Sequence, residues 1–238
     1  MITRIRSLVN QVRDQGWWVL GAVLLIGGAL QAFAELADEV EDGETHAFDR
    51  AVMLALREPG DPSDPLGPSW IEFLARDITA LGGTAVLVLL TLAVLGFLLL
   101  SRRWGAAVFV TLSMLGGTLL SNALKSAFDR PRPDLVPHAV EVSSASFPSG
   151  HAMLSAVAYL TLGALVAEVL PQRRFRVYLL LCAVFLTLLV GTTRVYLGVH
   201  WPSDVLAGWS IGAAWALMCA LMAWWMQKRG VIEDAATG

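Results

Sequence analysis

Three short strings of the sequence carry residue types that could handle a phosphoryl group. They span 125–133, 148–151 and 193–204. Together they supply cations, two of the chain's four histidines and, close to one of these, the carboxylate of Asp204, a set that could hold phosphate oxygens and attack the phosphorus with an imidazole. The side chains and backbone groups of interest are those of Lys125, Arg132, Ser149, Gly150, His151, Arg194, His200 and Asp204.

The first string contains Lys125 and, seven residues later, Arg132, at the end of an apolar stretch. A guanidinium fork and an ammonium point charge can share the oxygens of one phosphate. Arg130 adds a third cation, and Pro131 and Pro133 stiffen the segment. The alternative interpretation is a set of basic residues that extend from a helix end to the membrane surface.

The second string, Pro-Ser-Gly-His at 148–151, precedes another apolar stretch. Ser149 is a typical N-cap residue, and Gly150 lets the backbone approach a ligand closely. The first N–H groups of the following helix lack intrahelical partners and attract a phosphate. His151 would lie in that first turn, where it could protonate a leaving oxygen. A capped helix start with an interfacial histidine is the structural alternative.

The third string joins Thr193 and Arg194, at the end of one apolar stretch, to His200 and Asp204, at the start of the next. A spacing of four residues would place His200 and Asp204 on one face of a helical turn. The carboxylate could then accept a hydrogen bond from one imidazole nitrogen, which leaves the lone pair of the other nitrogen free. A polar cap, with Asp204 near a helix N-terminus for dipole reasons, would explain the pair without chemistry.

The composition indicates a membrane protein. Hydrophobic residues make up 56% of the chain and charged residues 16%, and the mean hydropathy is +0.62. A soluble domain usually carries about a quarter charged residues. Six apolar stretches have the length of roughly 20 residues that a bilayer-spanning helix needs. We place these spans at 17–36, 78–100, 106–124, 152–170, 177–195 and 205–226, and predict an all-α, six-span transmembrane helical bundle within a single domain, 1–238.

The distribution of basic residues predicts the orientation. Short cytoplasmic loops are enriched in Lys and Arg, and placing both termini inside gives every inside segment basic residues. The three strings then lie on the outer face, which in a bacterium is the periplasmic or exterior side of the cell membrane. The basic leader and residues 17–31, followed by Ala32-Phe33-Ala34, also resemble a cleaved signal peptide; cleavage would not move the strings to the other side.

The outside loop, about 37–77, is acidic, and we expect two short interfacial helices in it. The first carries an apolar stripe through Phe48, Val52 and Leu56, and the second begins with a capping box formed by Ser69 and Glu72. Residues 59–68 are rich in proline and glycine and predict turns. This loop either packs the bundle or shapes access for a lipid headgroup. In the last span, Gly208 and Gly212 predict close helix packing inside the bundle rather than dimerisation.

The three strings resemble the signature of the type 2 phosphatidic acid phosphatase superfamily, which also includes the vanadium haloperoxidases. Lys125, Arg132 and Pro133 match its first element, and 148–151 match its second in full. The third element matches at Arg194, His200 and Asp204, with Thr193 in the place of the usual serine. The signature covers residues 125–204, and the six-span layout resembles the branch of bacterial integral-membrane lipid phosphatases.

The resemblance implies a role for each residue. His200 is the nucleophile and becomes a phosphohistidine, Asp204 orients it, and His151 protonates the leaving oxygen. The phosphoryl oxygens are held by Lys125, Arg132, Ser149, Gly150 and Arg194. No metal or other cofactor is implied, because the cations stabilise the charge, and the sequence offers no carboxylate cluster suited to Mg²⁺.

The expected activity is hydrolysis of a lipid phosphate monoester or pyrophosphate at the outer membrane face. The expected partners are the lipid substrate and the bilayer, and nucleic acid is not among them. Phosphatidic acid, phosphatidylglycerophosphate, undecaprenyl pyrophosphate and lipid A phosphate all fit, and the sequence leaves this choice and the oligomeric state open. A lipid phosphotransferase is the first alternative, and a non-enzymatic membrane protein the second. A haloperoxidase is disfavoured because those enzymes are soluble.

Overall fold

The computed structural model describes residues 2–140 and 144–230 and is almost entirely helical. One small antiparallel hairpin interrupts the helices, and it lies in the loop predicted to be rich in turns. In chain order the elements are α1 (Ile2–Glu41), α2 (His46–Ala55), β1 (Arg57–Glu58), β2 (Asp61–Pro65), α3 (Ser69–Ala80), α4 (Thr84–Leu100), α5 (Trp104–Phe128), α6 (Gly150–Val169), α7 (Arg173–Tyr196) and α8 (Pro202–Lys228).

Six membrane spans are present, as predicted, if one bent helix pair is counted as a span. Five helices are long and apolar enough to cross a bilayer, and α3 with α4 forms the sixth crossing, with a bend of 45° between them. The predicted span 78–100 is not one continuous helix, because Ile78 belongs to α3 and α4 begins only at Thr84. The bend lies at Gly82-Gly83, where the chain leaves helical geometry and Gly83 caps α4 with an extended conformation.

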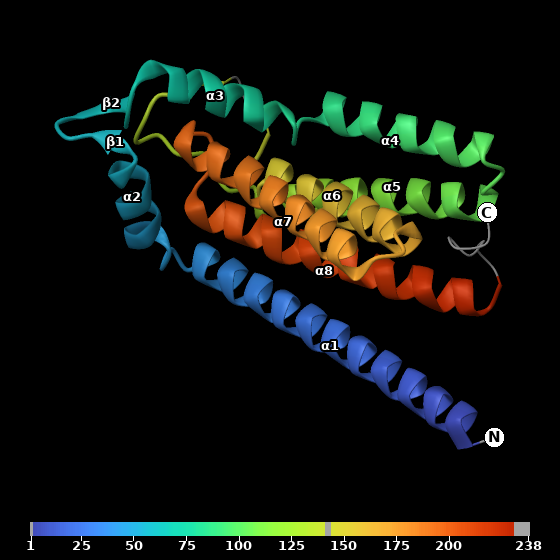
Figure 1. The fold of residues 1–238 in the computed structure, drawn as a ribbon. Helices are drawn as coiled ribbons and strands as arrows, with labels where there is room; N and C mark the ends of the chain where they lie inside the picture. Colours follow the sequence, from blue (N-terminus) through green and yellow to red (C-terminus); the bar gives the residue numbers. More distant parts are fainter. Residues whose placement is uncertain (1, 141–143, 231–238) are drawn as a thin grey trace.

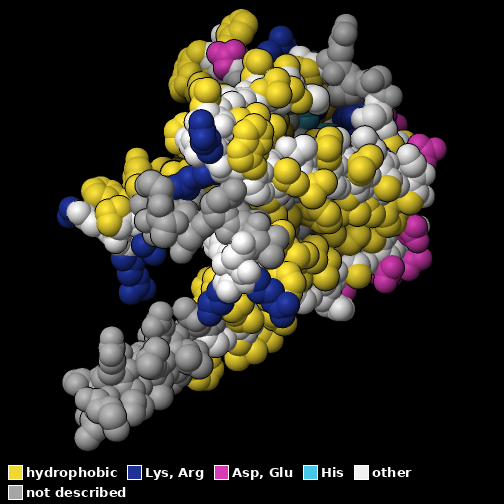
Figure 2. Space-filling view, turned by 90° about the vertical axis from the view of Figure 1, so that its right-hand side faces the viewer, with side chains coloured by type: hydrophobic (Ala, Val, Ile, Leu, Met, Phe, Trp, Pro, Cys, Tyr) yellow, Lys and Arg dark blue, Asp and Glu magenta, His cyan; other side chains and the backbone are white. Residues whose placement is uncertain are grey.

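The helices run roughly along one axis, so that the molecule has two distinct ends (Figure 1). The start of α1 and the end of α8 lie at one end, and α2 and the hairpin lie at the other. The first of these ends also carries the basic residues of the α4–α5 and α6–α7 connections and of the end of α8. Figure 2 looks onto this end and shows Lys and Arg side chains distributed over it. The connections predicted to lie inside are thus at one end of the bundle, and the orientation itself stays a prediction.

Close packing of α6, α7 and α8 forms the centre of the bundle. A Cβ atom added at Gly208 would lie 2.7 Å from the carbonyl oxygen of Ser149, and one at Gly212 would lie 2.6 Å from that of Met153. Glycine at both positions therefore lets α8 touch the backbone of α6. The prediction that these glycines pack inside the bundle is confirmed.

Both short helices of the outside loop exist, but α2 buries a different face from the predicted one. Asp49 and Met53 are fully buried, whereas Phe48 on the predicted apolar stripe is 49% exposed. The reason is that Asp49 pairs with a buried arginine, which allows a carboxylate to leave water. The stripe residues Phe48, Val52 and Leu56 instead line a groove of about 510 Å³ between α2, α3, α7 and α8.

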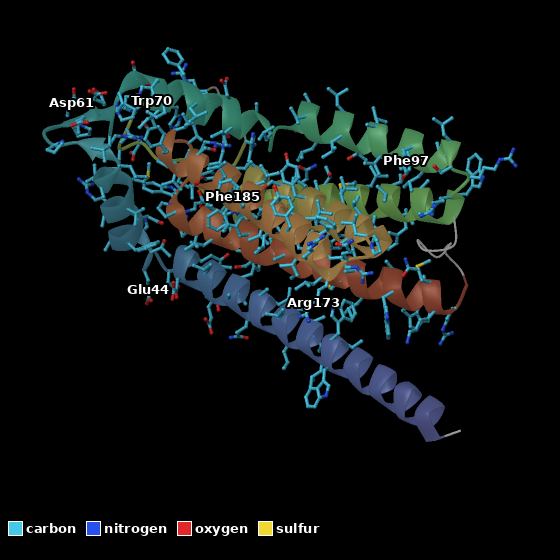
Figure 3. The ribbon with its side chains drawn as sticks, in the orientation of Figure 1. Glu44, Asp61, Trp70, Phe97, Arg173 and Phe185 are labelled. Carbon is cyan, nitrogen blue, oxygen red and sulfur yellow. The ribbon has the colours of Figure 1, made fainter. Side chains whose placement is uncertain are left out.

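The start of α3 also differs from its prediction. Pro68 is the N-cap and makes no side-chain cap, so that Ser69 and Glu72 form no capping box. The Glu72 carboxylate instead accepts a hydrogen bond from Arg76, one turn later on the same helix. Figure 3 shows Trp70 on α3 and Asp61 in the hairpin at the end of the molecule opposite to Phe97 of α4. The aromatic side chains of Trp70 and Phe73 are 60% and 65% exposed, as expected for residues that contact lipid.

Candidate active site

The three strings meet at the end of the bundle that carries α2 and the hairpin. The first lies at the end of α5 and in the loop after it, the second at the start of α6, and the third spans the turn from α7 to α8. Lys125 lies in the last turn of α5 and not at its end, since the helix continues to Phe128 and closes with Asp129 in a left-handed conformation. Helix ends therefore bring these polar groups together.

His200 and Asp204 are neighbours, but not for the reason that their spacing suggested. His200 lies in the turn before α8, which begins at Pro202, so the two residues do not share a helical turn. Asp204 instead occupies the first turn of α8, where its Oδ2 accepts the N–H of Trp201 at 2.9 Å. Nδ1 of His200 lies 3.4 Å from the same oxygen. Because a carboxylate only accepts hydrogen bonds, this contact assigns the proton to Nδ1 and leaves a lone pair on Nε2.

Burial and nearby charges keep His200 neutral. The side chain is 1% exposed. The pKa of His200 is lowered to about 4, mainly by loss of solvation and also by the positive charges of Arg132 and Arg194, which together outweigh the raising effect of Asp204. A histidine with this pKa is unprotonated at neutral pH, which is the state that a nucleophile requires.

Arg132 approaches the free nitrogen of His200, and Lys125 lies beside Arg132. Nη1 of Arg132 lies 3.3 Å from Nε2 of His200 and donates to the carbonyl oxygen of Val199 at 2.6 Å. Arg132 and Lys125 also share one partner, the hydroxyl of Ser144, at 3.2 Å and 3.3 Å. Burial lowers the pKa of Arg132, which nevertheless stays cationic. The two cations therefore flank the position that a phosphoryl group would take in front of Nε2.

Arg194 is a buried cation held at the α3–α4 bend. Its Nη1 donates to Oγ1 of Thr79 at 3.0 Å, and its Nε is buried without a hydrogen-bond partner among the described residues. The side chain is 3% exposed. An arginine in this state has an N–H group available for an anion, and its charge acts on His200 as described above.

The start of α6 has the geometry predicted for it. Ser149 is the N-cap, and its hydroxyl accepts the N–H of Ala152 at 3.5 Å. A Cβ atom at Gly150 would lie 3.3 Å from Cε of Lys125, so the lysine passes close over the glycine backbone. His151 follows in the first turn and borders the α3–α4 bend, where a Cβ atom at Gly82 would lie 3.4 Å from the imidazole Cδ2. Glycines thus bring both the lysine and the bend close to the helix start.

The segment 144–147 is a part of the site that the sequence did not reveal. The hydroxyl of Ser146 donates a hydrogen bond to Oδ2 of Asp204. The Oγ atom of Ser146 also lies 3.3 Å from Nδ1 of His200. Phe147 is fully buried and anchors the segment against Phe33 of α1 and Phe128 of α5, with ring centroids 5.9 Å and 4.9 Å away. A serine that precedes Phe-Pro-Ser in a polar segment gives no local signal of this contact.

Arg130 was predicted to act as a third cation beside Lys125 and Arg132, but its guanidinium contacts carboxylates instead. Its guanidinium forms ion pairs with Asp49 at 2.8 Å and with Asp204 at 2.6 Å. It also donates to Ser203 at 2.8 Å and to Thr45 at 3.2 Å. The side chain is 9% exposed and faces the carboxylate of Asp204 rather than the front of His200. Arg130 therefore belongs to the support of the carboxylate, together with Asp49, which the sequence gave no reason to select.

The sequence matches the model of a known protein family. The model of the PAP2 superfamily matches residues 106–229, which contain all eight predicted site residues. The chain belongs to the PAP2 superfamily. Asp49 and Thr79, which contact the site from α2 and α3, lie outside the matched region of this PAP2 protein.

Several relatives in the superfamily are membrane lipid phosphatases. The chain is 32% identical over 189 residues to phosphatidylglycerophosphatase B of Bacillus subtilis, a match that covers 76% of this chain and 85% of the relative. It is 38% identical over 128 residues to the lipid A 1-phosphatase of Rhizobium johnstonii, covering 50% of this chain and 47% of the relative. Among solved structures, a transmembrane PAP2-type phosphatidylglycerolphosphate phosphatase from Bacillus subtilis superposes with a TM-score of 0.76 at 28% identity, covering 84% of this chain and 96% of that one.

The fold and family together identify this PAP2 chain as a multi-pass membrane protein. Within the described residues, no group of three or more His, Cys, Asp or Glu side chains is arranged to hold a metal ion. The positive charges at the site come from lysine and arginine side chains.

Proposed function

We propose that the protein is a phosphatase that hydrolyses a membrane lipid phosphate through a phosphohistidine. The observation that carries this proposal is the approach of Arg132 to within 3.3 Å of the free nitrogen of His200, while Asp204 lies on the opposite nitrogen. A neutral imidazole with its lone pair directed toward a cationic pocket can attack a phosphorus atom. The lipid phosphatases among the relatives support the same substrate class.

The first step would form the phosphoenzyme. Nε2 of His200 attacks the phosphorus, the bond from phosphorus to the lipid oxygen breaks, and His151 gives a proton to the departing oxygen. The products are a lipid alcohol, or a lipid monophosphate from a pyrophosphate, and phosphohistidine. Asp204 stabilises the positive charge that develops on the imidazole, and Lys125, Arg132, Arg194, Ser149 and the N–H of Gly150 stabilise the phosphoryl oxygens.

The second step would release phosphate. Water attacks the phosphorus, His151 accepts a proton from that water, and the bond between phosphorus and Nε2 breaks. Inorganic phosphate leaves and His200 returns to its neutral form. The same intermediate would permit transfer to a lipid alcohol if one took the place of water.

The site would face the periplasm or cell exterior, with both termini in the cytoplasm. Basic residues at the end of the bundle where α1 begins and α8 ends support this orientation. A substrate would then present its headgroup from the outer leaflet of the cell membrane.

A phosphate-release assay tests the proposal. The wild-type protein in detergent would be given phosphatidic acid, phosphatidylglycerophosphate, undecaprenyl pyrophosphate or lipid A phosphate. We expect phosphate release from at least one of them, loss of release and of trapped phosphohistidine in His200→Ala, and normal release in the control His46→Ala, whose side chain is exposed on α2. Activity that survives in His200→Ala, or a folded wild-type protein inactive on the whole panel, would overturn the proposal.

A further inference from the structure

A buried chain of charges runs from α2 to the carboxylate that supports His200. Nη2 of Arg130 donates a hydrogen bond to Oδ2 of Asp49 at 2.8 Å, and Nη1 of Arg130 donates one to Oδ1 of Asp204 at 2.6 Å. Ser203 closes the arrangement, since its N–H and hydroxyl donate to Asp49 at 2.9 Å and 2.7 Å. Asp49 and Asp204 are both fully buried.

The charges in this chain alternate in sign. Asp204 and Arg130 alone would form a neutral pair, and the close guanidinium would compete with the imidazole of His200 for the carboxylate. The charge of Asp49 balances Arg130 from its other side, so that the three groups together retain one negative charge. At low effective dielectric, a full charge at hydrogen-bond distance has a large effect on the energy of a neighbouring charge.

The position of Asp49 separates it from the phosphoryl pocket. It lies on α2, and the guanidinium of Arg130 stands between it and Asp204. Its contacts are with Arg130 and Ser203 and not with the cations in front of His200. An effect of Asp49 on the reaction must therefore pass through Arg130 or Ser203, both of which adjoin Asp204.

We propose that Asp49 is a positioning residue that neutralises Arg130 and thereby lets Asp204 stabilise positive charge on His200. This inference rests on the proposed function, because it assumes that His200 becomes cationic during the reaction. It assigns to the first outside loop a part in the chemistry, in addition to its packing on the bundle. The loop would act through one carboxylate, whatever the identity of the lipid.

The variant Asp49→Asn tests the proposal because it removes the charge and keeps the shape. We expect kcat for phosphatidic acid in mixed micelles to fall about 10- to 100-fold, the range seen when outer partners of metal-bound histidines are removed in other proteins. KM is expected to stay at its wild-type value, since Asp49 does not touch the phosphate. Asp61→Asn, which removes an exposed carboxylate from the same loop, is the matched control and should leave kcat unchanged.

The double variant Asp49→Asn/Arg130→Gln separates charge balance from simple packing. With the uncompensated guanidinium removed as well, Asp204 regains its full charge, so kcat should rise above that of Asp49→Asn. A structural role would instead make the double variant as slow as the single one or slower, and that result, or a wild-type kcat in Asp49→Asn, would overturn the proposal. If Asp49→Asn does not fold, the double variant is judged alone: it should keep about a tenth of the wild-type kcat or more, and a loss as large as that of Asp204→Asn would overturn the proposal.

The wild-type protein and His200→Ala in the same assay keep the two proposals apart. Phosphate release by the wild-type protein and its loss in His200→Ala would uphold the proposed function whatever the Asp49 variants do. A failure of the expected order among the Asp49 variants would then count against the positioning role alone.

Discussion

Nδ1 of His200 lies 3.4 Å from Oδ2 of Asp204, although His200 belongs to a turn and Asp204 to the first turn of α8. The helix start, rather than a shared helical face, brings the two together, because the same carboxylate oxygen also accepts the N–H of Trp201. The N–H of Trp201 and the guanidinium of Arg130 thus hold the Asp204 carboxylate in place independently of the imidazole. The orientation of His200 should therefore survive changes in the phosphate-binding cations.

The role proposed for His151 predicts a dependence on the leaving group. An aryl phosphate needs little protonation as its oxygen departs, whereas a lipid alkoxide needs a great deal. General acid catalysis accelerates a reaction about 10²–10⁴-fold. The rate of phosphate release by His151→Ala should therefore fall by that factor with a lipid phosphate and by a clearly smaller factor with para-nitrophenyl phosphate. His200→Ala should be inactive on both substrates. Equal losses in His151→Ala would mean that this histidine binds phosphate or supports structure.

The cationic pocket predicts a reaction that does not depend on metal ions. Because lysine and arginine side chains would hold the phosphoryl oxygens, excess EDTA should leave the rate of phosphate release unchanged. Vanadate, which mimics the trigonal bipyramidal transition state, should inhibit. Activity that is lost in EDTA and restored by Mg²⁺ would rule out the proposed site.

The orientation can be measured with reporters at two positions. A reporter fused after Gly238 should score as cytoplasmic, and one inserted near Asp61, in the exposed hairpin, should score as external. The opposite pattern would place the candidate active site in the cytoplasm and contradict an extracytoplasmic substrate.

The lowered pKa of His200 predicts its titration. Since burial favours the neutral imidazole, His200 should take up a proton only as the pH falls through about 4, and not near 6.5. The active, unprotonated form is then complete at neutral pH and is lost below that midpoint. Nuclear magnetic resonance of histidine-labelled protein would give the midpoint, with the signals assigned by their absence in His200→Ala. A midpoint near 6.5 would show that the imidazole is solvated.

Packing at Gly208 predicts a coupled loss of stability and activity. A Cβ atom there would meet the carbonyl oxygen of Ser149 at 2.7 Å, so Gly208→Ala must push α8 away from the start of α6. Overpacking of this kind costs about 1–3 kcal/mol, and it would displace Ser149 and Gly150. Thermal unfolding in detergent and phosphate release should both show the change. Gly96→Ala on α4, where a Cβ atom meets nothing within 4 Å, is the control and should be tolerated.

The sequence predicted the features that depend on local pattern. Spans are set by the thickness of the bilayer, and the N-cap at Ser149 and the first-turn position of Pro202 follow from short-range rules. The break at Gly82-Gly83 was missed because both glycines lie in an uncharged run that satisfies the length criterion. The pair is itself a recognised helix breaker and offered the signal.

Contacts between distant residues could not be predicted in this way. Arg130 pairs with Asp49, which lies 81 residues away in the sequence. Three cations lie within eight residues, and nothing in that pattern indicates that Arg130 contacts the carboxylates of Asp49 and Asp204 while the other two contact Ser144. Ser146 reaches Asp204 because Phe147 is anchored among aromatic rings of α1 and α5. Both depend on how helices pack, and the pattern of a single segment does not contain that information.

The chain of charges from Asp49 to Asp204 also sets an order of assembly. Synthesis proceeds from the N-terminus, so Asp49 and Arg130 reach their side of the membrane well before α8 exists. Until Asp204 is inserted with the last span, His200 has no carboxylate to fix its tautomer, so a nascent or truncated chain that ends before α8 holds the imidazole without its partner. If His200 is the nucleophile as proposed, full activity therefore begins only after the last span is in place.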